Sequence, residues 1–282
     1  MSQTVSLRKR LGAFAVGAAL VLLPTGVLAQ ASGAPAAAPS AGQASSEDES
    51  YFLPITQRRF TLPSRIILPY AVLLDIPPAS SDASNFLALN LGTLFGFADR
   101  WMVDATFAPL VLSESFRYGN PELGFAYQVV DSRPFELGVT ARAFFSSTGV
   151  VFSGVETGAL VLLRSGRVRL DVGAFLPIST SGQPVGVLRA SRVGLRVPVS
   201  VLLQLNEHFH VALRSGATFG DLGTVGDTFA LPLGVTAGFS TNVHGFWIDV
   251  LPFFSFPAFY GREGVNTRVM SFGLSTGFSK KL

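Results

Sequence analysis

Ionised side chains recur at alternate positions of several apolar segments, and they are the groups of this chain best suited to chemistry. Acidic residues and arginines are nearly balanced among them: Asp104, Glu122, Glu136, Arg142, Glu156, Arg164, Arg169, Asp171, Arg192, Arg196, Arg214 and Asp249. Charges removed from water need partners, so one hypothesis is that they pair across neighbouring segments. The other is a basic strip that binds an anionic or zwitterionic solute, formed by Arg169, Arg192, Arg196 and Arg214.

Catalytic and metal-binding patterns are weak by comparison. The chain has three histidines, His208, His210 and His244, and no cysteine. His208 and His210 share one face of a segment, but two ligands without a third make a poor metal site. A serine hydrolase needs an activated serine, and neither Ser215 nor Ser240 lies in a G-x-S-x-G motif. We therefore predict no catalytic residue, no metal and no cofactor.

The charged segments are joined by polar connections that alternate between short and long. The short ones read Ala98-Asp99-Arg100, Asp131-Ser132-Arg133, Ser165-Gly166-Arg167, Asn206-Glu207-His208 and Thr241-Asn242-Val243-His244. The longer ones lie near 76–83, 113–119, 147–153, 180–187, 221–227 and 260–266. A transmembrane β-barrel has this asymmetry, because its short turns face the periplasm and its longer loops face outward.

Period-two alternation predicts strands between these connections. In residues 135–145 one face is entirely apolar, whereas the other carries Glu136, Gly138, Thr140 and Arg142. Such faces hold mostly small residues with scattered charges, which is too little charge for a surface in water. We therefore place the polar face inside and the apolar face against lipid. The predicted strands number about twelve: 65–75, 84–97, 101–112, 120–130, 134–146, 154–164, 167–179, 188–204, 208–220, 228–241, 245–259 and 266–280.

Composition supports an all-β, transmembrane, antiparallel up-and-down barrel. Only 14% of residues are charged. After residue 29 no stretch approaches the ~18 uninterrupted apolar residues of a spanning helix, so a closed sheet is the remaining way to satisfy the backbone in lipid. An even strand number puts both termini on the periplasmic side. Aromatic residues near the turns should form an interfacial girdle: Phe97, Trp101, Phe209, Phe246, Trp247 and Phe278.

The N-terminal region has three predicted parts ahead of a barrel at 65–282. Residues 1–29 have a basic start, an apolar run and Ala29 at a cleavage point, as in a secretory signal peptide; a retained membrane anchor is the alternative. Residues 30–50 are rich in Ala, Pro and Ser and should be a disordered linker. Residues 51–64 should be a periplasmic segment.

Removal of the signal peptide changes the charge balance. The whole chain has 21 basic and 18 acidic residues, and residues 1–29 hold three bases and no acid, which leaves 18 of each. A neutral chain gives no electrostatic basis for binding nucleic acid.

Two sequence features bear on the barrel interior. Residues 62–74 are apolar on both faces and contain Pro63 and Pro69, so we expect a bulge in a strand there. A segment that follows the periplasmic rim or enters the lumen is the alternative. Inward glycines such as Gly138 and Gly238 would leave space in the lumen, or else permit curvature and close packing.

Residues 60–282 resemble Gram-negative outer-membrane β-barrel proteins of the porin-like or transporter-like kind. The resemblance lies in units of apolar strand, polar turn and apolar strand, such as residues 94–101 and 203–209. It implies outer-membrane lipids and the barrel-assembly machinery as partners. Lys280-Lys281-Leu282 follow Phe278 where the class usually ends in an aromatic residue, so the assembly signal is partial.

The expected function is a passive channel or transporter for small solutes, and not an enzyme. One alternative is a non-conducting structural or partner-docking barrel. A weaker one is an outer-membrane lipid-modifying enzyme. Conductance distinguishes the first two, and lipid turnover would reveal the third.

Overall fold

The computed structural model describes residues 53–78, 85–113, 116–132, 134–147, 149, 151–182 and 192–282. Its long strands are β1 (Ile66–Ile76), β2 (Phe86–Ala98), β3 (Trp101–Val111), β5 (Glu122–Asp131), β6 (Phe135–Phe145), β7 (Phe152–Ser165), β8 (Val168–Ser179), β9 (Leu195–Gln204), β10 (Phe209–Phe219), β11 (Phe229–Val243), β12 (Phe246–Gly261) and β14 (Ser271–Lys281). Its short elements are the 3-10 turns η1 (Ile55–Gln57) and η2 (Leu222–Thr224), the helix α3 (Val225–Thr228), and β4 (Arg117–Tyr118) and β13 (Gly264–Val265). Within these residues no helix has the length and apolar character needed to cross a bilayer.

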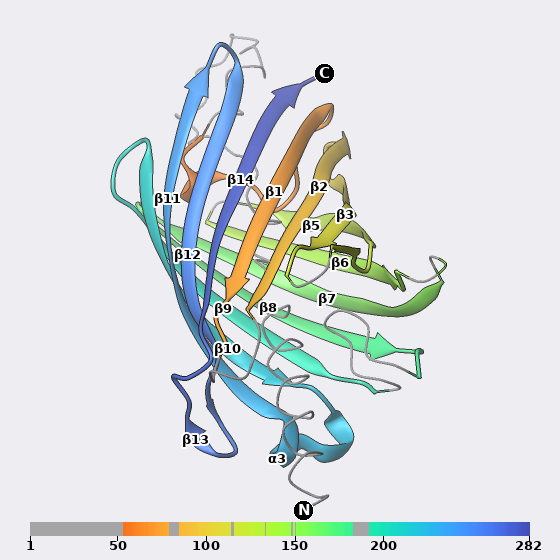
Figure 1. Cartoon of the computed structure of the whole chain (residues 1–282). Coiled ribbons are helices and arrows are strands. Elements are labelled where there is room, and N and C mark those ends of the chain that lie inside the picture. The colour runs from red at the N-terminus through yellow and green to blue at the C-terminus, as the bar shows by residue number, and fades with distance from the viewer. Residues whose placement is uncertain are drawn as a thin grey trace, which may run out of the picture.

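The twelve long strands form one closed antiparallel ring (Figure 1). Each pairs with the long strands before and after it in sequence, and β1 pairs with β14 to complete the circle. The short β4 and β13 pair only with β3 and β12. Closure leaves no long strand with an open edge, whose unpaired backbone groups lipid could not satisfy. The predicted fold class is confirmed.

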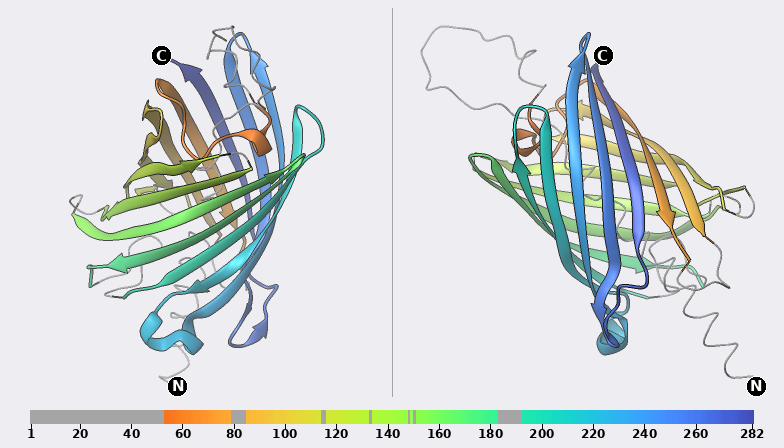
Figure 2. Two further views of the ribbon diagram at one scale, coloured as in Figure 1. Left: turned by 180° about the vertical axis from the view of Figure 1, so that it is seen from behind. Right: turned by 60° about the vertical axis from the view of Figure 1, so that its left-hand side comes forward.

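Tight turns and longer connections lie at opposite ends of the ring (Figure 2). The end with the tight turns, where β14 also finishes, is referred to below as the turn end, and the end with β4, α3 and β13 as the loop end. Local chemistry shapes the tight turns. The Asn206 side-chain oxygen accepts hydrogen bonds from the backbone N–H groups of His208 and Phe209, both at 2.9 Å. Gly166 has a φ of 56°, which glycine adopts without strain.

Burial alternates along the strands as the period-two pattern predicts. In β10 the side chains of His210 and Ala212 are buried, whereas those of Phe209, Val211 and Leu213 are exposed. The outside of the ring is thus apolar and the inside carries the polar and ionised groups. This is the distribution of a barrel that sits in lipid.

Trp247 is an exception among the aromatic residues predicted for the girdle. Five of the six have exposed side chains: Phe97, Trp101, Phe209, Phe246 and Phe278. Trp247 is 7% exposed, and its Nε1 donates a hydrogen bond to Asp249 at 3.0 Å. The prediction for Trp247 was wrong because alternation puts it on the inner face, next to the outward Phe246.

β1 takes its place in the ring without the bulge expected at its proline. Ile67 pairs with Lys280 and Tyr70 with Gly277, so the register is the same on both sides of Pro69. The strand is apolar on both faces because one face meets lipid and the other packs inside the barrel.

β9 is shorter than predicted. It begins at Leu195, and Arg192 lies in the connection ahead of it, with only an isolated bridge between Val193 and Ile178. Gly194 donates to the carbonyl of Pro177 at 2.9 Å, but Pro177 has no N–H to donate in return. The ladder therefore weakens at this point.

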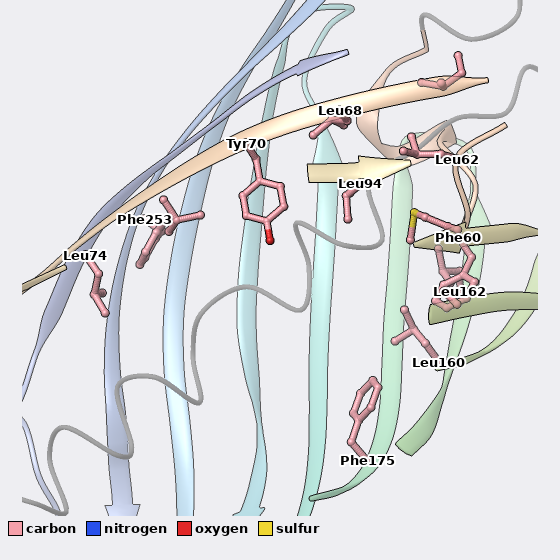
Figure 3. Close-up of a cluster of buried hydrophobic side chains, with 14 of the residues drawn as sticks. Phe60, Leu62, Leu68, Tyr70, Leu74, Leu94, Leu160, Leu162, Phe175 and Phe253 are labelled. Carbon is pink, nitrogen blue, oxygen red and sulfur yellow. The ribbon is translucent and has the colours of Figure 1, made fainter. Parts of the chain in front are cut away.

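An apolar cluster occupies the barrel interior beside β1 (Figure 3). It gathers side chains from several strands and from the residues ahead of β1: Phe60, Leu62, Leu68, Tyr70, Leu74, Leu94, Leu160, Leu162, Phe175 and Phe253. The lumen is therefore not uniformly polar. Its β1 side is apolar, and its ionised groups project from other strands.

Aromatic rings cover several inward glycines. A Cβ at Gly138 would lie 2.0 Å from Cε1 of Phe60, and one at Gly238 would lie 2.0 Å from Cε1 of His210. The expectation that these glycines leave open space was wrong. The absence of a side chain lets a ring lie directly on the strand, which is close packing of the kind that glycine permits in sheets.

Candidate functional site

Residues 53–62, referred to below as the inner segment, lie inside the turn end of the barrel. Ile55 and Leu62 are fully buried, and Thr56 and Arg58 are 2% and 3% exposed. The hydroxyl of Thr61 donates to the side chain of Gln128 on β5 at 3.0 Å. Figure 2 shows the coil of η1 at this end of the ring. The lumen was considered from sequence only as an alternative for residues 62–74; most of these residues form β1 in the wall, and it is the chain ahead of β1 that lies inside the ring.

A buried ion pair joins the inner segment to β12. The Arg58 guanidinium donates to both carboxylate oxygens of Asp249, at 2.6 and 2.7 Å. Asp249 also accepts from the Ser240 hydroxyl and from Trp247, while Nε of Arg58 donates to the carbonyl of Leu53 at 3.0 Å. A buried pair is stable when geometry is good and its remaining hydrogen-bonding positions are filled. Both conditions hold here.

A second pair, on β6 and β7, binds the backbone of the inner segment. Arg164 donates to Glu136 at 2.7 Å and to the carbonyl of Thr56 at 3.0 Å. Glu136 in turn accepts the backbone N–H of Phe60 at 2.8 Å. Two wall residues of opposite charge thus satisfy backbone groups that strand pairing does not reach.

A third pair, within β8, does the same. Arg169 is fully buried and binds both oxygens of Asp171, at 2.6 and 2.7 Å. It also donates to the carbonyls of Ile55 and Arg58, at 3.0 and 3.3 Å. The three pairs together, Arg58–Asp249, Arg164–Glu136 and Arg169–Asp171, form the turn-end network.

A separate network lies further from the turn end. Arg142 on β6 donates to Asp104 on β3 at 3.1 Å and to Glu122 on β5 at 3.3 Å. The hydroxyl of Tyr70 on β1 donates to Asp104 at 3.1 Å and lies 2.8 Å from the Thr106 hydroxyl. These contacts cross four strands and tie the apolar side of the lumen to the charged side.

Arg196 and Glu156 form a further ion pair in the interior. Arg196 on β9 reaches across β8 to bind Glu156 on β7, with Nε 2.8 Å from one carboxylate oxygen. Its guanidinium lies 5.5 Å from the ring centre of Phe175, a cation–π contact. Both charged side chains are less than 8% exposed.

These ion pairs bear on the hypothesis of a basic strip formed by Arg169, Arg192, Arg196 and Arg214. Arg169 and Arg196 are each neutralised by a carboxylate. Arg192 lies outside the strands, is 58% exposed, and faces Asp221 at 3.3 Å. Only Arg214 has no ion pair and no hydrogen bond within the described parts of the chain. Of the two hypotheses, the structure favours pairing, because three of the four arginines face a carboxylate and form no continuous strip of unpaired charge.

Histidine chemistry has little support in this geometry. His208 faces the backbone carbonyl of Ser240 at 2.9 Å, and His210 lies flat on Gly238. His244 is in a tight turn with a φ of 52°. Among the residues that the structure describes, no group of three or more acidic or histidine side chains is placed to hold a metal.

The inner segment is the part of the site that sequence reasoning missed. Arg58 carries its most buried charge, yet it precedes the first strand and belongs to no alternating pattern. Its signal in the sequence is a mixed stretch in which buried apolar residues (Leu53, Ile55, Phe60 and Leu62) flank two adjacent arginines. Gln128 and Gln204 were missed as well, because their hydrogen-bond partners lie in that same segment.

Comparison with known proteins gives the fold. No protein-family model matches the sequence, and no curated protein matches it. Among solved structures, an outer membrane channel from Pseudomonas putida F1 is 12% identical, with a TM-score of 0.50, covering 78% of this chain and 96% of its own. The NanC porin is 11% identical, with a TM-score of 0.48, covering 77% of this chain and 100% of its own. The translocator domain of autotransporter NalP from Neisseria meningitidis is 11% identical, with a TM-score of 0.46, covering 77% of this chain and 88% of its own.

Identities this low show a shared architecture and nothing finer. The closed ring, its apolar outside and its ionised interior agree with that architecture. The chain is a twelve-strand antiparallel β-barrel with the fold of outer-membrane channels.

Proposed function

We propose that this protein is a passive outer-membrane channel or transporter for small solutes. The supporting observation is the ionised interior. Within the ring, five arginines form ion pairs with six acidic side chains. The arginines are Arg58, Arg142, Arg164, Arg169 and Arg196. A barrel that served only as an anchor could fill its core with apolar side chains at lower cost, because buried ion pairs contribute little net stability.

The same proposal includes the route to the membrane. Residues 1–29 direct export and are removed, residues 30–50 form a linker, and residues 51–64 and the C-terminus lie on the periplasmic side with the tight turns. The barrel-assembly machinery inserts residues 65–282 among outer-membrane lipids. In this orientation the inner segment narrows the periplasmic opening of the barrel. Solutes would pass either between the inner segment and the wall, or through the opening left when the inner segment moves.

Planar-bilayer recording tests the channel. We expect the mature chain, residues 30–282, to give stepwise conductance in potassium chloride, because a polar interior is hydrated. A barrel that is folded by heat-dependent electrophoretic migration and yet electrically silent would contradict the proposal.

The non-conducting barrel is the second candidate, and one observation favours it. The turn-end network binds the inner segment through charged contacts to several strands, which closes much of that mouth. Silence in bilayers for both the full mature chain and a chain that lacks the inner segment would favour this docking or structural function.

A further inference from the structure

We propose that Arg214 is the anchor of a binding subsite for a small organic monocarboxylate inside the barrel. This inference rests on the proposed channel function and specifies the solute class that its lumen would recognise.

Arg214 differs from every other arginine of the interior. Each of the five others has a carboxylate partner within 3.3 Å. In the described parts of the chain Arg214 has none, and its Nε is shielded from water without a hydrogen-bond partner. Arg214 as a whole is half-buried, so the rest of its guanidinium can still be reached from the lumen. A partly shielded guanidinium with no carboxylate in contact favours an anion, and a wall that pairs its other arginines is suited to one supplied from outside.

The nearest wall carboxylate is already used. Strand pairing sets Asp171, Ser200 and Arg214 in one row across β8, β9 and β10. Asp171 gives both of its oxygens to Arg169. Arg214 therefore keeps its hydrogen-bonding capacity.

A hollow lies on the other side of Arg214. It is lined by Arg214, Gly234, Val235, Thr236, Phe253, Phe254 and Ser255. Gly234 lets the wall residue Ser255 come close at its rim, since a Cβ at Gly234 would lie 2.8 Å from that of Ser255. The hydroxyl of Thr236, a side chain 4% exposed, has no hydrogen-bond partner in the structure. A free guanidinium and a free hydroxyl thus border the same space.

These groups define the ligand class. One guanidinium and one hydroxyl match one carboxylate group, which accepts several hydrogen bonds and carries a single charge. Phe253 belongs to the apolar cluster that continues to Tyr70 and Leu74 (Figure 3). The rest of the ligand therefore meets an apolar surface, so a compact apolar body is favoured over a sugar or a second charge.

Benzoate and its uncharged analogue benzamide are suitable probes. Binding to the folded mature barrel in detergent is measured by calorimetry. We expect benzoate to bind about tenfold more tightly than benzamide, because a hydrogen bond to a charged group is stronger than one to a neutral group. Arg214→Gln should remove this preference, and Thr236→Val should weaken benzoate binding severalfold. Equal binding of the two probes to the unmodified barrel overturns the subsite without any variant.

The matched control is Arg262→Gln. It removes the same charge from the loop end, where Arg262 is 68% exposed and paired with Asp227. Benzoate binding should be unchanged in this variant; equal loss in both variants would show a general charge effect and overturn the proposal. Binding in detergent does not require conduction. A silent barrel that prefers benzoate refutes the channel alone, and a conducting barrel without that preference refutes the subsite alone.

Discussion

Arg58 shows how one side chain can hold two parts of the fold together. Its guanidinium donates two hydrogen bonds to Asp249 and one to the carbonyl of Leu53, and it lies 5.2 Å from the ring centre of Trp247. Replacing it leaves a buried carboxylate without its counter-charge. The cost of such a loss exceeds the net value of the intact pair.

Arg58→Met should therefore destabilise the barrel by about 3 kcal/mol. Urea unfolding of the protein in detergent micelles measures this change. Arg59→Met serves as the control, because the Arg59–Asp131 pair has side chains 39% and 22% exposed, and pairs in water contribute about 1 kcal/mol or less. Equal destabilisation by both variants would show that Arg58 has no special structural role.

At the level of elements, the inner segment is the feature with the clearest functional consequence. It adds no strand to the ring, yet wall residues on β6, β7, β8 and β12 bind it. Its backbone carbonyls accept from Arg164 and Arg169, so side chains of the wall replace the partners that a strand ladder would supply.

Deletion of residues 53–62 should raise single-channel conductance several-fold, because it removes the packed side chains that narrow the turn end. Deletion of residues 40–49 is the control, because it removes the same number of residues from the chain that precedes the inner segment. Bilayer recording of the two variants beside the full mature chain gives the comparison. Similar conductance in all three would mean that the inner segment does not restrict the path.

The strands could be predicted from sequence, whereas this segment could not. Alternation and the rhythm of short and long connections together located the twelve long strands, although β1 is apolar on both faces, and β3 begins at Trp101 as predicted. Alternation indicates which face of a strand each side chain occupies. It is therefore a reliable guide where one face of the strand meets lipid and the other meets the lumen. The environment of Arg58 depends on a contact with Asp249, 191 positions away, and no local pattern encodes that pairing.

The candidate site could be predicted only in part for the same reason. Alternation selected the inward charges, including Glu136, Arg169 and Arg214, but which arginine stays unpaired is fixed by register between strands. Arg192 was included because its strand was predicted to begin at residue 188, whereas β9 begins at Leu195 and the ladder is interrupted where Pro177 faces Gly194. Trp247 was misassigned because proximity to a turn was given more weight than its place in the alternation.

For the whole molecule, the decisive property is an apolar outer surface around a charged interior. Exposed side chains such as Phe125, Val139, Leu213 and Val235 are spread around the ring. A continuous belt of this kind is not stable in water.

The purified mature chain should accordingly fold only in detergent or lipid. In buffer without detergent it should aggregate, as measured by sedimentation velocity, and in micelles it should be a folded β-protein by circular dichroism. A folded monomer in plain buffer would mean that the apolar faces point inward, and the orientation of every strand would have to be reversed.

The pairing of β1 with β14 constrains the order of events during biogenesis. The inner segment leads directly into β1, which is the first strand and also the one that the last strand must find. Arg164 and Arg169, which bind the segment, lie on β7 and β8, far along the ring from the β1–β14 seam. We therefore expect the segment to dock before or while β1 and β14 pair, so that the last strand closes a barrel whose interior is already occupied.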